Sequence, residues 1–274
     1  MNRLLSLFII NQFNWIHLII LAFYPLFIVA SYFIFKNKDE HAKNCYMWIL
    51  MIIAFVITWL VFITDFFFNE KHVPEIWKRL PLHMCSINVI LYPLFFSLRK
   101  HKWPFLVSTL LAYMYFIGSP GALLGLILPP GNGDCIDGVS IFKYNVFVYY
   151  IKHGLIFSIP IIMIVLGYYR PKWKDIFKAA GFLFIFLFIM YGVNYFFYLI
   201  SKLQIEGGYW PNYFYIIDGS STPVLSTFWN LNPKPLIYLF PLVIVAVIIF
   251  FIYYLPFMVM SLCKRYSFSI RKTR

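Results

Sequence analysis

Charged residues are scarce in this sequence of 274 residues. Asp, Glu, Lys and Arg make up 12% of the chain, hydrophobic residues make up 62%, and the mean hydropathy is +0.78. In a soluble globular domain about a quarter of the residues are charged. The composition therefore excludes a soluble domain and predicts a protein that lies in a membrane.

Sequence motifs of nucleotide-dependent and metal-dependent enzymes are also missing. The chain has no phosphate-binding Gly loop, no dinucleotide fingerprint and no Gly-x-Ser-x-Gly turn. It has no Cys-x-x-Cys or His-Glu-x-x-His spacing, which are common arrangements of zinc ligands. We therefore expect no cofactor and no metal.

Seven apolar stretches occupy most of the chain. Each is long enough to cross a hydrocarbon core of roughly 30 Å, which takes about 20 helical residues. Because backbone groups in lipid must pair within the chain, we expect an all-α polytopic membrane bundle in a single domain, residues 1–274. The expected spans are residues 15–35, 46–68, 80–98, 104–128, 145–167, 177–200 and 234–260.

Lys and Arg are distributed unevenly between the two sides of these spans. Fifteen of them fall on the side that holds the carboxyl terminus and seven on the opposite side. The positive-inside rule then places the amino terminus outside and the carboxyl terminus in the cytoplasm, in a multi-pass protein of the cell membrane. Anionic headgroups account for the net charge of +13, so we expect no nucleic-acid partner.

The fourth stretch contains the segment Gly118-Ser119-Pro120-Gly121, which predicts that this helix is broken. One interpretation is a simple kink. The other is unwound backbone that offers N–H donors to a ligand, which is tolerated in a membrane only against protein or a water-filled cavity.

Polar residues inside the spans gather at one depth. At 1.5 Å per helical residue, the outer half of the bilayer holds His17, Asp65, Cys85, His153 and Asn194. Asn88 and Tyr92 share the helical face of Cys85, and Tyr149 and Lys152 share that of His153. Because polar groups in lipid mark functional sites, we expect these side chains to line a common cavity.

Four segments of the chain carry a family resemblance. In order, they are Leu80-Pro-Leu-His-Met-Cys85, Gly118–Pro129, Tyr149-Tyr-Ile-Lys-His153 and Val193-Asn194-Tyr195. Over residues 45–250 the chain resembles the YwaF-like bacterial integral membrane proteins, which look related to a eukaryotic transmembrane acyltransferase of ether phospholipids. The resemblance implies a multispanning fold that moves fatty acyl chains between phospholipids through a Cys and a His, matched here by Cys85 and His153. A later Asn–Tyr pair of the family corresponds to Asn212–Tyr213, displaced by an insertion.

The chemistry of Cys85 and His153 suits this activity. An imidazole can take the proton of a thiol, and the resulting thiolate attacks an ester to form a thioester. The expected partner is a membrane phospholipid or fatty acyl ester that enters from the outer leaflet. His83 lies about 200° around a helix from Cys85, so we prefer His153 as the base and give His83 a supporting role.

The remaining candidate residues are assigned to binding and support. Lys152, together with Tyr149, is expected to hold the lipid, with the Lys152 side chain extended toward the headgroup phosphate. Asn88 or the backbone near Gly121 would stabilise the oxyanion, and Asp65 would orient an imidazole. Asn194 is a further supporting residue.

Several alternatives remain open. Buried Cys and His residues also occur for packing alone. Cys85 could instead form a disulfide with Cys135 of the outer loop, and His83, Cys85, His153 and Asp65 together offer ligand types that bind metals. A protein that carries lipid or a small solute through the broken fourth helix is the alternative function. The sequence leaves the oligomeric state open.

Overall fold

The computed structural model describes residues 8–68, 80, 82–99, 104–129, 138–203, 208 and 210–272, without the side chains of 61, 65–68, 84, 223 and 261–272. The helices of this part of the chain are α2 (Trp15–Phe35), α3 (Glu40–Phe68), α5 (Met84–Leu98), α6 (Pro104–Tyr113), the π-helix η2 (Met114–Gly118), α7 (Ser119–Ile127), α8 (Tyr144–Val165), α9 (Trp173–Lys202), η3 (Tyr213–Tyr215), α10 (Pro223–Leu231), η4 (Ile237–Leu239) and α11 (Phe240–Lys272). The prediction of an all-α bundle is confirmed.

Six helical segments of the described residues are long and apolar enough to cross a membrane. They correspond to six of the seven expected spans, and the first, Trp15–Phe35, has the expected bounds. The third expected span contains the shorter α5, whose 15 residues extend about 22 Å at 1.5 Å per residue. The orientation of the termini relative to the membrane stays a prediction.

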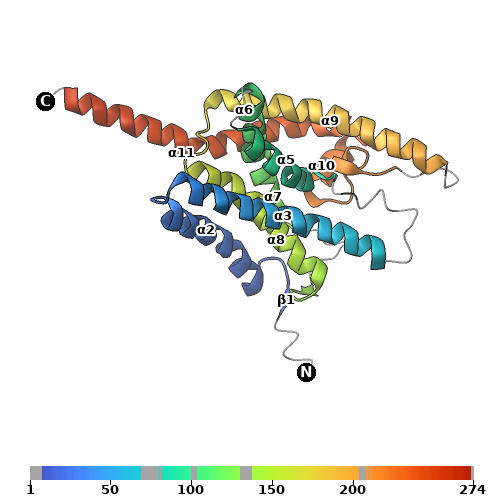
Figure 1. Ribbon diagram of the computed structural model, residues 1–274. Coiled ribbons are helices and arrows are strands. Elements are labelled where there is room, and N and C mark those ends of the chain that lie inside the picture. The colour runs from blue at the N-terminus through green and yellow to red at the C-terminus, as the bar shows by residue number, and fades with distance from the viewer. Residues whose placement is uncertain are drawn as a thin grey trace.

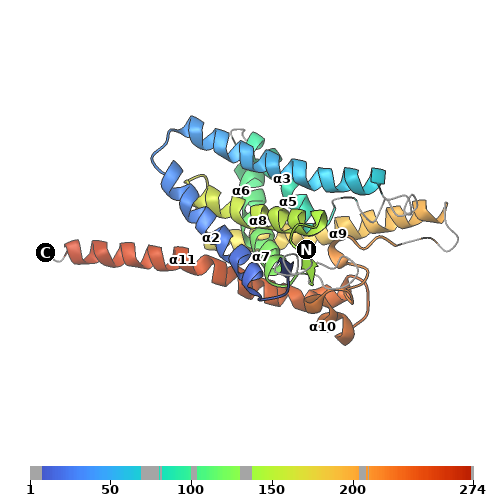
Figure 2. The same ribbon diagram turned by 90° about the horizontal axis from the view of Figure 1, so that it is seen from below.

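The central helices are α8 and the continuous rod of α6, η2 and α7. In the most apolar 18-residue segment of the rod, 72% of the residues are buried, and in that of α8 the share is 67%. In the corresponding segment that includes the start of α11 it is 6%. Figure 1 shows α2 and α3 beside α8, and Figure 2 shows α3 and α11 on opposite sides of the bundle. The apolar surfaces of α2, α3, α9 and α11 are therefore available to lipid.

The predicted break in the fourth helix is an interruption by a π-turn. Residues Met114–Gly118 form η2, and Gly118 (φ −62°, ψ −50°) and Ser119 (φ −63°, ψ −53°) keep right-handed helical backbone. The helix therefore continues without an unwound segment, and Pro120 is accommodated in the first turn of α7. The second interpretation of this segment, exposed backbone donors, is wrong.

A short antiparallel pairing fixes the amino-terminal segment. Strand β1 (Ile9–Ile10) pairs with β2 (Val139–Ser140), with Ile9 opposite Ser140. The buried His17 then joins the start of α2 to the end of α7. Its Nδ1 accepts from the Phe13 N–H at 2.9 Å, and its Nε2–H donates to the Leu126 carbonyl at 2.7 Å.

At the other end of the bundle a buried carboxylate caps α9. Asp175 accepts hydrogen bonds from the Tyr169 hydroxyl at 2.8 Å and the Lys172 N–H at 3.0 Å, and it forms an ion pair with Lys178 at 2.9 Å. Burial and the Asp175 carboxylate raise the pKa of Tyr169. Asp175 thus satisfies a free N–H of the first helical turn, as capping carboxylates do.

Candidate functional site

The amino-terminal end of α5 begins the candidate site. Met84 is its first residue, and His83 is the N-cap, with extended backbone at φ −70° and ψ 155°. The 200° relation holds only when both residues lie inside one helix, so it does not apply to His83 and Cys85. The direction of the His83 ring relative to Cys85 stays a prediction.

Cys85 lies in the first turn of α5 with a half-buried side chain and a free thiol. The free thiol of Cys85 gives no support to the alternative of a disulfide with Cys135, and Cys135 itself lies outside the described residues. The Cys85 side chain packs against the buried cluster that contains Tyr92 and Tyr113. A position in the first turn of a helix is typical of activated cysteines, because the positive end of the helix dipole lies there.

Lys152 brings a positive charge into this cluster. Its Nζ donates to the Ser86 hydroxyl oxygen at 3.5 Å, which joins α8 to the residue after Cys85. The sequence suggested that Lys152 extends toward the lipid headgroup, whereas in the structure its ammonium faces the start of α5.

The tautomer of His153 follows from its hydrogen bond. Its Nδ1 lies 2.9 Å from the Tyr149 carbonyl oxygen, which can only accept. Nδ1 therefore carries the proton, and the neutral ring keeps a lone pair on Nε2, as a general base requires. The neutral His17 is the opposite tautomer, with both nitrogens committed to structural hydrogen bonds. Of the two histidines that are buried in the described part of the chain, only His153 has the protonation pattern of a base.

Tyr149 and Gly125 hold the His153 ring in place. The Tyr149 ring packs on the imidazole with centroids 4.0 Å apart, and its hydroxyl donates to the Gly125 carbonyl at 2.7 Å. A Cβ atom on Gly125 would lie 3.1 Å from His153 Cδ2 and 3.4 Å from Nε2. The absence of a side chain on Gly125 therefore allows α7 to approach the reactive edge of the imidazole.

A loop after α9 covers the His83 side of the site. The His83 ring packs against Tyr213 at 5.7 Å and Tyr215 at 5.4 Å between centroids. Asn194 fixes this loop, because its Oδ1 accepts from the Tyr213 N–H at 2.9 Å and its Nδ2 donates to the Tyr213 carbonyl at 3.1 Å. Asn212 bonds the backbone of Asp218, which closes the loop. Asn194 thus fixes the position of the loop that packs against His83.

Three other predicted residues take different places. Asn88 is fully buried on α5 with its amide against Gly118 of η2. Gly121 lies within helical α7, so the role expected of unwound backbone there does not apply. Asp65 lies in α3, and its side chain lies outside the described part of the chain. Among the described residues no three His, Cys, Asp or Glu side chains gather as metal ligands.

Ser86, Tyr113 and Gly125 were not among the site residues predicted from the sequence. The spacing of Gly118, Gly121 and Gly125 along one helix was an available signal, because small residues at such intervals allow close helix approach in membranes. For Tyr113 no signal was available, since the chain contains 21 tyrosines. Only packing distinguishes its hydroxyl from the others.

The fold and this polar cluster define a multi-pass helical membrane protein with reactive groups inside the bundle. A comparison with family models matches residues 11–254 to the TMEM164 family. The chain belongs to this family, and the match includes Cys85, His153 and Lys152. Searches of curated proteins and of solved structures find no match.

Proposed function

We propose that this protein transfers or hydrolyses fatty acyl groups of membrane phospholipids through a thioester on Cys85. The observation that carries the proposal is the approach of α8 to the start of α5, where Cys85 has a free thiol. Lys152 of α8 donates to Ser86, the residue after Cys85, and the buried His153, with its proton on Nδ1, follows Lys152 in the chain. Such groups are costly inside a membrane protein and are retained for function. The resemblance of the chain to the YwaF-like proteins, and through them to a eukaryotic ether-phospholipid acyltransferase, supports the same assignment.

The first half-reaction forms the thioester. His153 Nε2 takes the thiol proton, and the Cys85 sulfur attacks the ester carbonyl carbon of the phospholipid. The tetrahedral intermediate collapses as the C–O bond breaks, and the leaving lysophospholipid oxygen receives the proton from His153. The Lys152 ammonium stabilises the negative charge on sulfur and on the carbonyl oxygen during these steps.

The second half-reaction restores the enzyme. A hydroxyl group of an acceptor lysophospholipid, or water, gives its proton to His153 Nε2 and attacks the thioester carbonyl. The C–S bond breaks, and the proton returns to the Cys85 sulfur. When the acceptor is a lysophospholipid the product is an acylated phospholipid, and when it is water the product is a free fatty acid.

His83 is the second candidate for the base. His83 precedes Cys85 by two residues, and among the described residues its Nδ1 has no hydrogen-bond partner. His153 is preferred because its tautomer is fixed by a hydrogen bond and its ring is held on two sides. A comparison of His153→Gln with His83→Gln separates the two roles.

The transporter alternative receives less support. It relied on unwound backbone at Gly118–Gly121 as a ligand site, and the structure shows helical backbone through this segment. The outer-leaflet location of the site and the cell-membrane location of the protein remain part of the proposal.

The decisive experiment follows the acyl chain. Purified protein is reconstituted in diacylphosphatidylcholine vesicles with an alkyne-tagged acyl chain, quenched in acid and examined by intact mass and hydroxylamine release. We expect a hydroxylamine-labile adduct on the wild type and none on Cys85→Ala. The matched control is Cys45→Ala, which removes another free but exposed thiol and should form the adduct as the wild type does. A wild type without adduct, or equal labelling of Cys85→Ala, would refute the proposal.

A further inference from the structure

The hydroxyl group of Tyr113 has no hydrogen-bond partner among the described residues, although the side chain is fully buried. Other buried tyrosines of the bundle use their hydroxyls to join helices. Tyr24 donates to the Tyr150 carbonyl, Tyr92 to that of Ile156 and Tyr115 to that of Tyr253. A buried hydroxyl without a partner is unfavourable, and such groups in native proteins often serve a ligand or a reaction.

The backbone around Tyr113 is unusual as well. Tyr113 ends α6 and immediately precedes the π-turn η2. Isolated π-turns within α-helices occur frequently at functional sites, because the extra residue changes the direction of the side chains around it. The turn at Met114–Gly118 therefore sets where the Tyr113 side chain lies between the helices.

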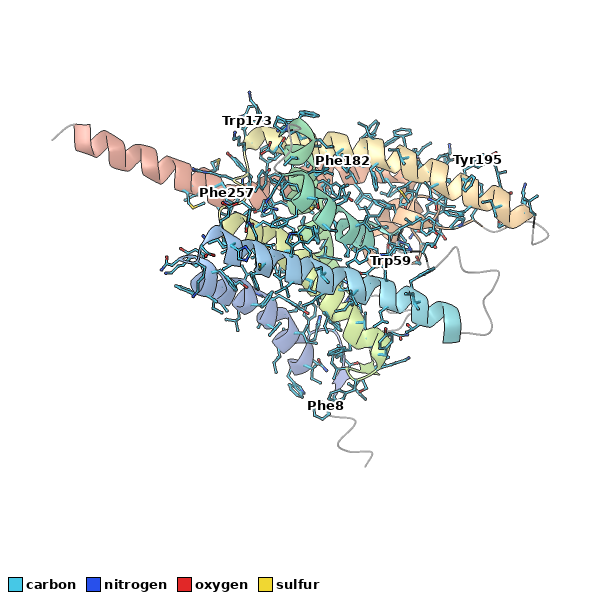
Figure 3. All side chains as sticks on the ribbon, in the orientation of Figure 1. Phe8, Trp59, Trp173, Phe182, Tyr195 and Phe257 are labelled. Carbon is cyan, nitrogen blue, oxygen red and sulfur yellow. The ribbon has the colours of Figure 1, made fainter. Side chains whose placement is uncertain are left out.

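The Tyr113 ring is held by aromatic packing from α9. Its centroid lies 4.9 Å from that of Phe182 and 6.2 Å from that of Phe186. Figure 3 shows Phe182 on α9 beside α6, on the inner side of the bundle. Because the ring is fixed by packing alone, the hydroxyl is free to donate to a group that enters the site.

The Tyr113 side chain and the thiol belong to one packed region. Tyr113 and Tyr92 lie in the same buried cluster, and the Cys85 side chain packs against this cluster. A Tyr hydroxyl can donate one hydrogen bond, and beside a nucleophile the acceptor that needs such a donor is the oxygen of the attacked carbonyl.

We propose that the Tyr113 hydroxyl donates a hydrogen bond to the acyl carbonyl oxygen of the phospholipid ester, and of the thioester that follows, at Cys85. The proposal rests on the thioester function proposed above. As the sulfur–carbon bond forms, the carbonyl electron pair moves to oxygen, and the Tyr113 O–H stabilises the resulting charge. On collapse the pair returns to the carbonyl, and Tyr113 keeps its proton throughout.

The test compares Tyr113→Phe with Tyr115→Phe, two residues further along the same helical rod. Both changes remove one buried hydroxyl and keep the ring. Tyr113→Phe loses no hydrogen bond of the resting protein, so its Tm should equal or exceed that of the wild type. Its single-turnover rate of Cys85 acylation should fall on the order of 10²-fold, as for loss of an oxyanion donor. Tyr115→Phe loses its bond to Tyr253, so its Tm should fall while its acylation rate stays unchanged.

The outcomes separate this inference from the function itself. If the wild type forms no hydroxylamine-labile adduct, the thioester function fails and this inference fails with it. If the wild type is acylated and Tyr113→Phe reacts at the wild-type rate, only the role of Tyr113 is refuted. A lowered Tm of Tyr113→Phe would also contradict the inference, because it would show that the hydroxyl has a structural partner.

Discussion

A single methyl group on Gly125 should disturb catalysis more than stability. The added Cβ would lie 3.1 Å from both His153 Cδ2 and the Tyr149 hydroxyl, so these side chains must move by a few tenths of an ångström. Gly→Ala in a helix interior gains about 1 kcal/mol, and crowding in a packed core costs about 1–3 kcal/mol. The net change in unfolding free energy of Gly125→Ala should therefore lie between about zero and a loss of 2 kcal/mol.

The rate of acylation should respond more strongly. A misplacement of about 1 Å costs about 10²-fold in rate, so a shift of a few tenths of an ångström in the His153 ring should cost about 5-fold. The matched control is Gly181→Ala on α9, where an added Cβ meets no atom within 4 Å. This control should gain up to about 1 kcal/mol in stability and keep the wild-type rate.

The assay measures both quantities on the same reconstituted samples. Thermal unfolding gives the difference in stability, and the hydroxylamine-labile adduct on Cys85 at short times gives the rate. If Gly125→Ala gains as much stability as Gly181→Ala and is acylated at the wild-type rate, the imidazole is not confined between α7 and Tyr149. The argument for His153 as the positioned base would then be refuted.

Three further predictions concern support of the site and of the fold. Lys152→Met keeps the alkyl chain and removes the charge, so acylation should slow by at least about 10-fold, whereas the exposed Lys143→Met should react as the wild type does. Asn194→Ala removes both hydrogen bonds to the Tyr213 backbone and should lower the free energy of unfolding by about 2–4 kcal/mol. Hydrogen exchange of the Tyr213 amide should become faster, and an unchanged rate of exchange would contradict this prediction. Asp175→Ala removes the buried cap of α9 and should cost about 2 kcal/mol, seen as a lower Tm with an unchanged rate per folded molecule.

Much of the fold could be predicted because membrane insertion depends on local composition. The first span, Trp15–Phe35, has the expected bounds, and those of the α6–α7 rod and α8 are within one or two residues of expectation. The start of α5 was missed by four residues, because the apolar run continues through the extended segment before Met84. Apolar length detects a span, but backbone geometry decides where its helix begins.

Helical spacing predicted that Cys85, Lys152 and His153 line a common cavity, and this stays a prediction. The structure does bring α8 to the start of α5, at the contact of Lys152 with Ser86, the residue after Cys85. Spacing could not show that the ammonium turns toward Ser86, which is 66 residues away in sequence. It also could not show that Asn194 acts on Tyr213, because the loop between them has no periodicity.

The sequence by itself determined that this is a helical membrane protein with a thiol and an imidazole inside its spans. Those properties follow from the composition and period of short segments. Only the tertiary structure decided that the fourth helix turns through a π-helix and that Nδ1 of His153 carries the proton. It also decided that the Tyr113 hydroxyl has no hydrogen-bond partner in the part of the chain that is described. Each of these depends on which atoms of distant helices lie within hydrogen-bonding distance, and that information exists only once the helices have packed.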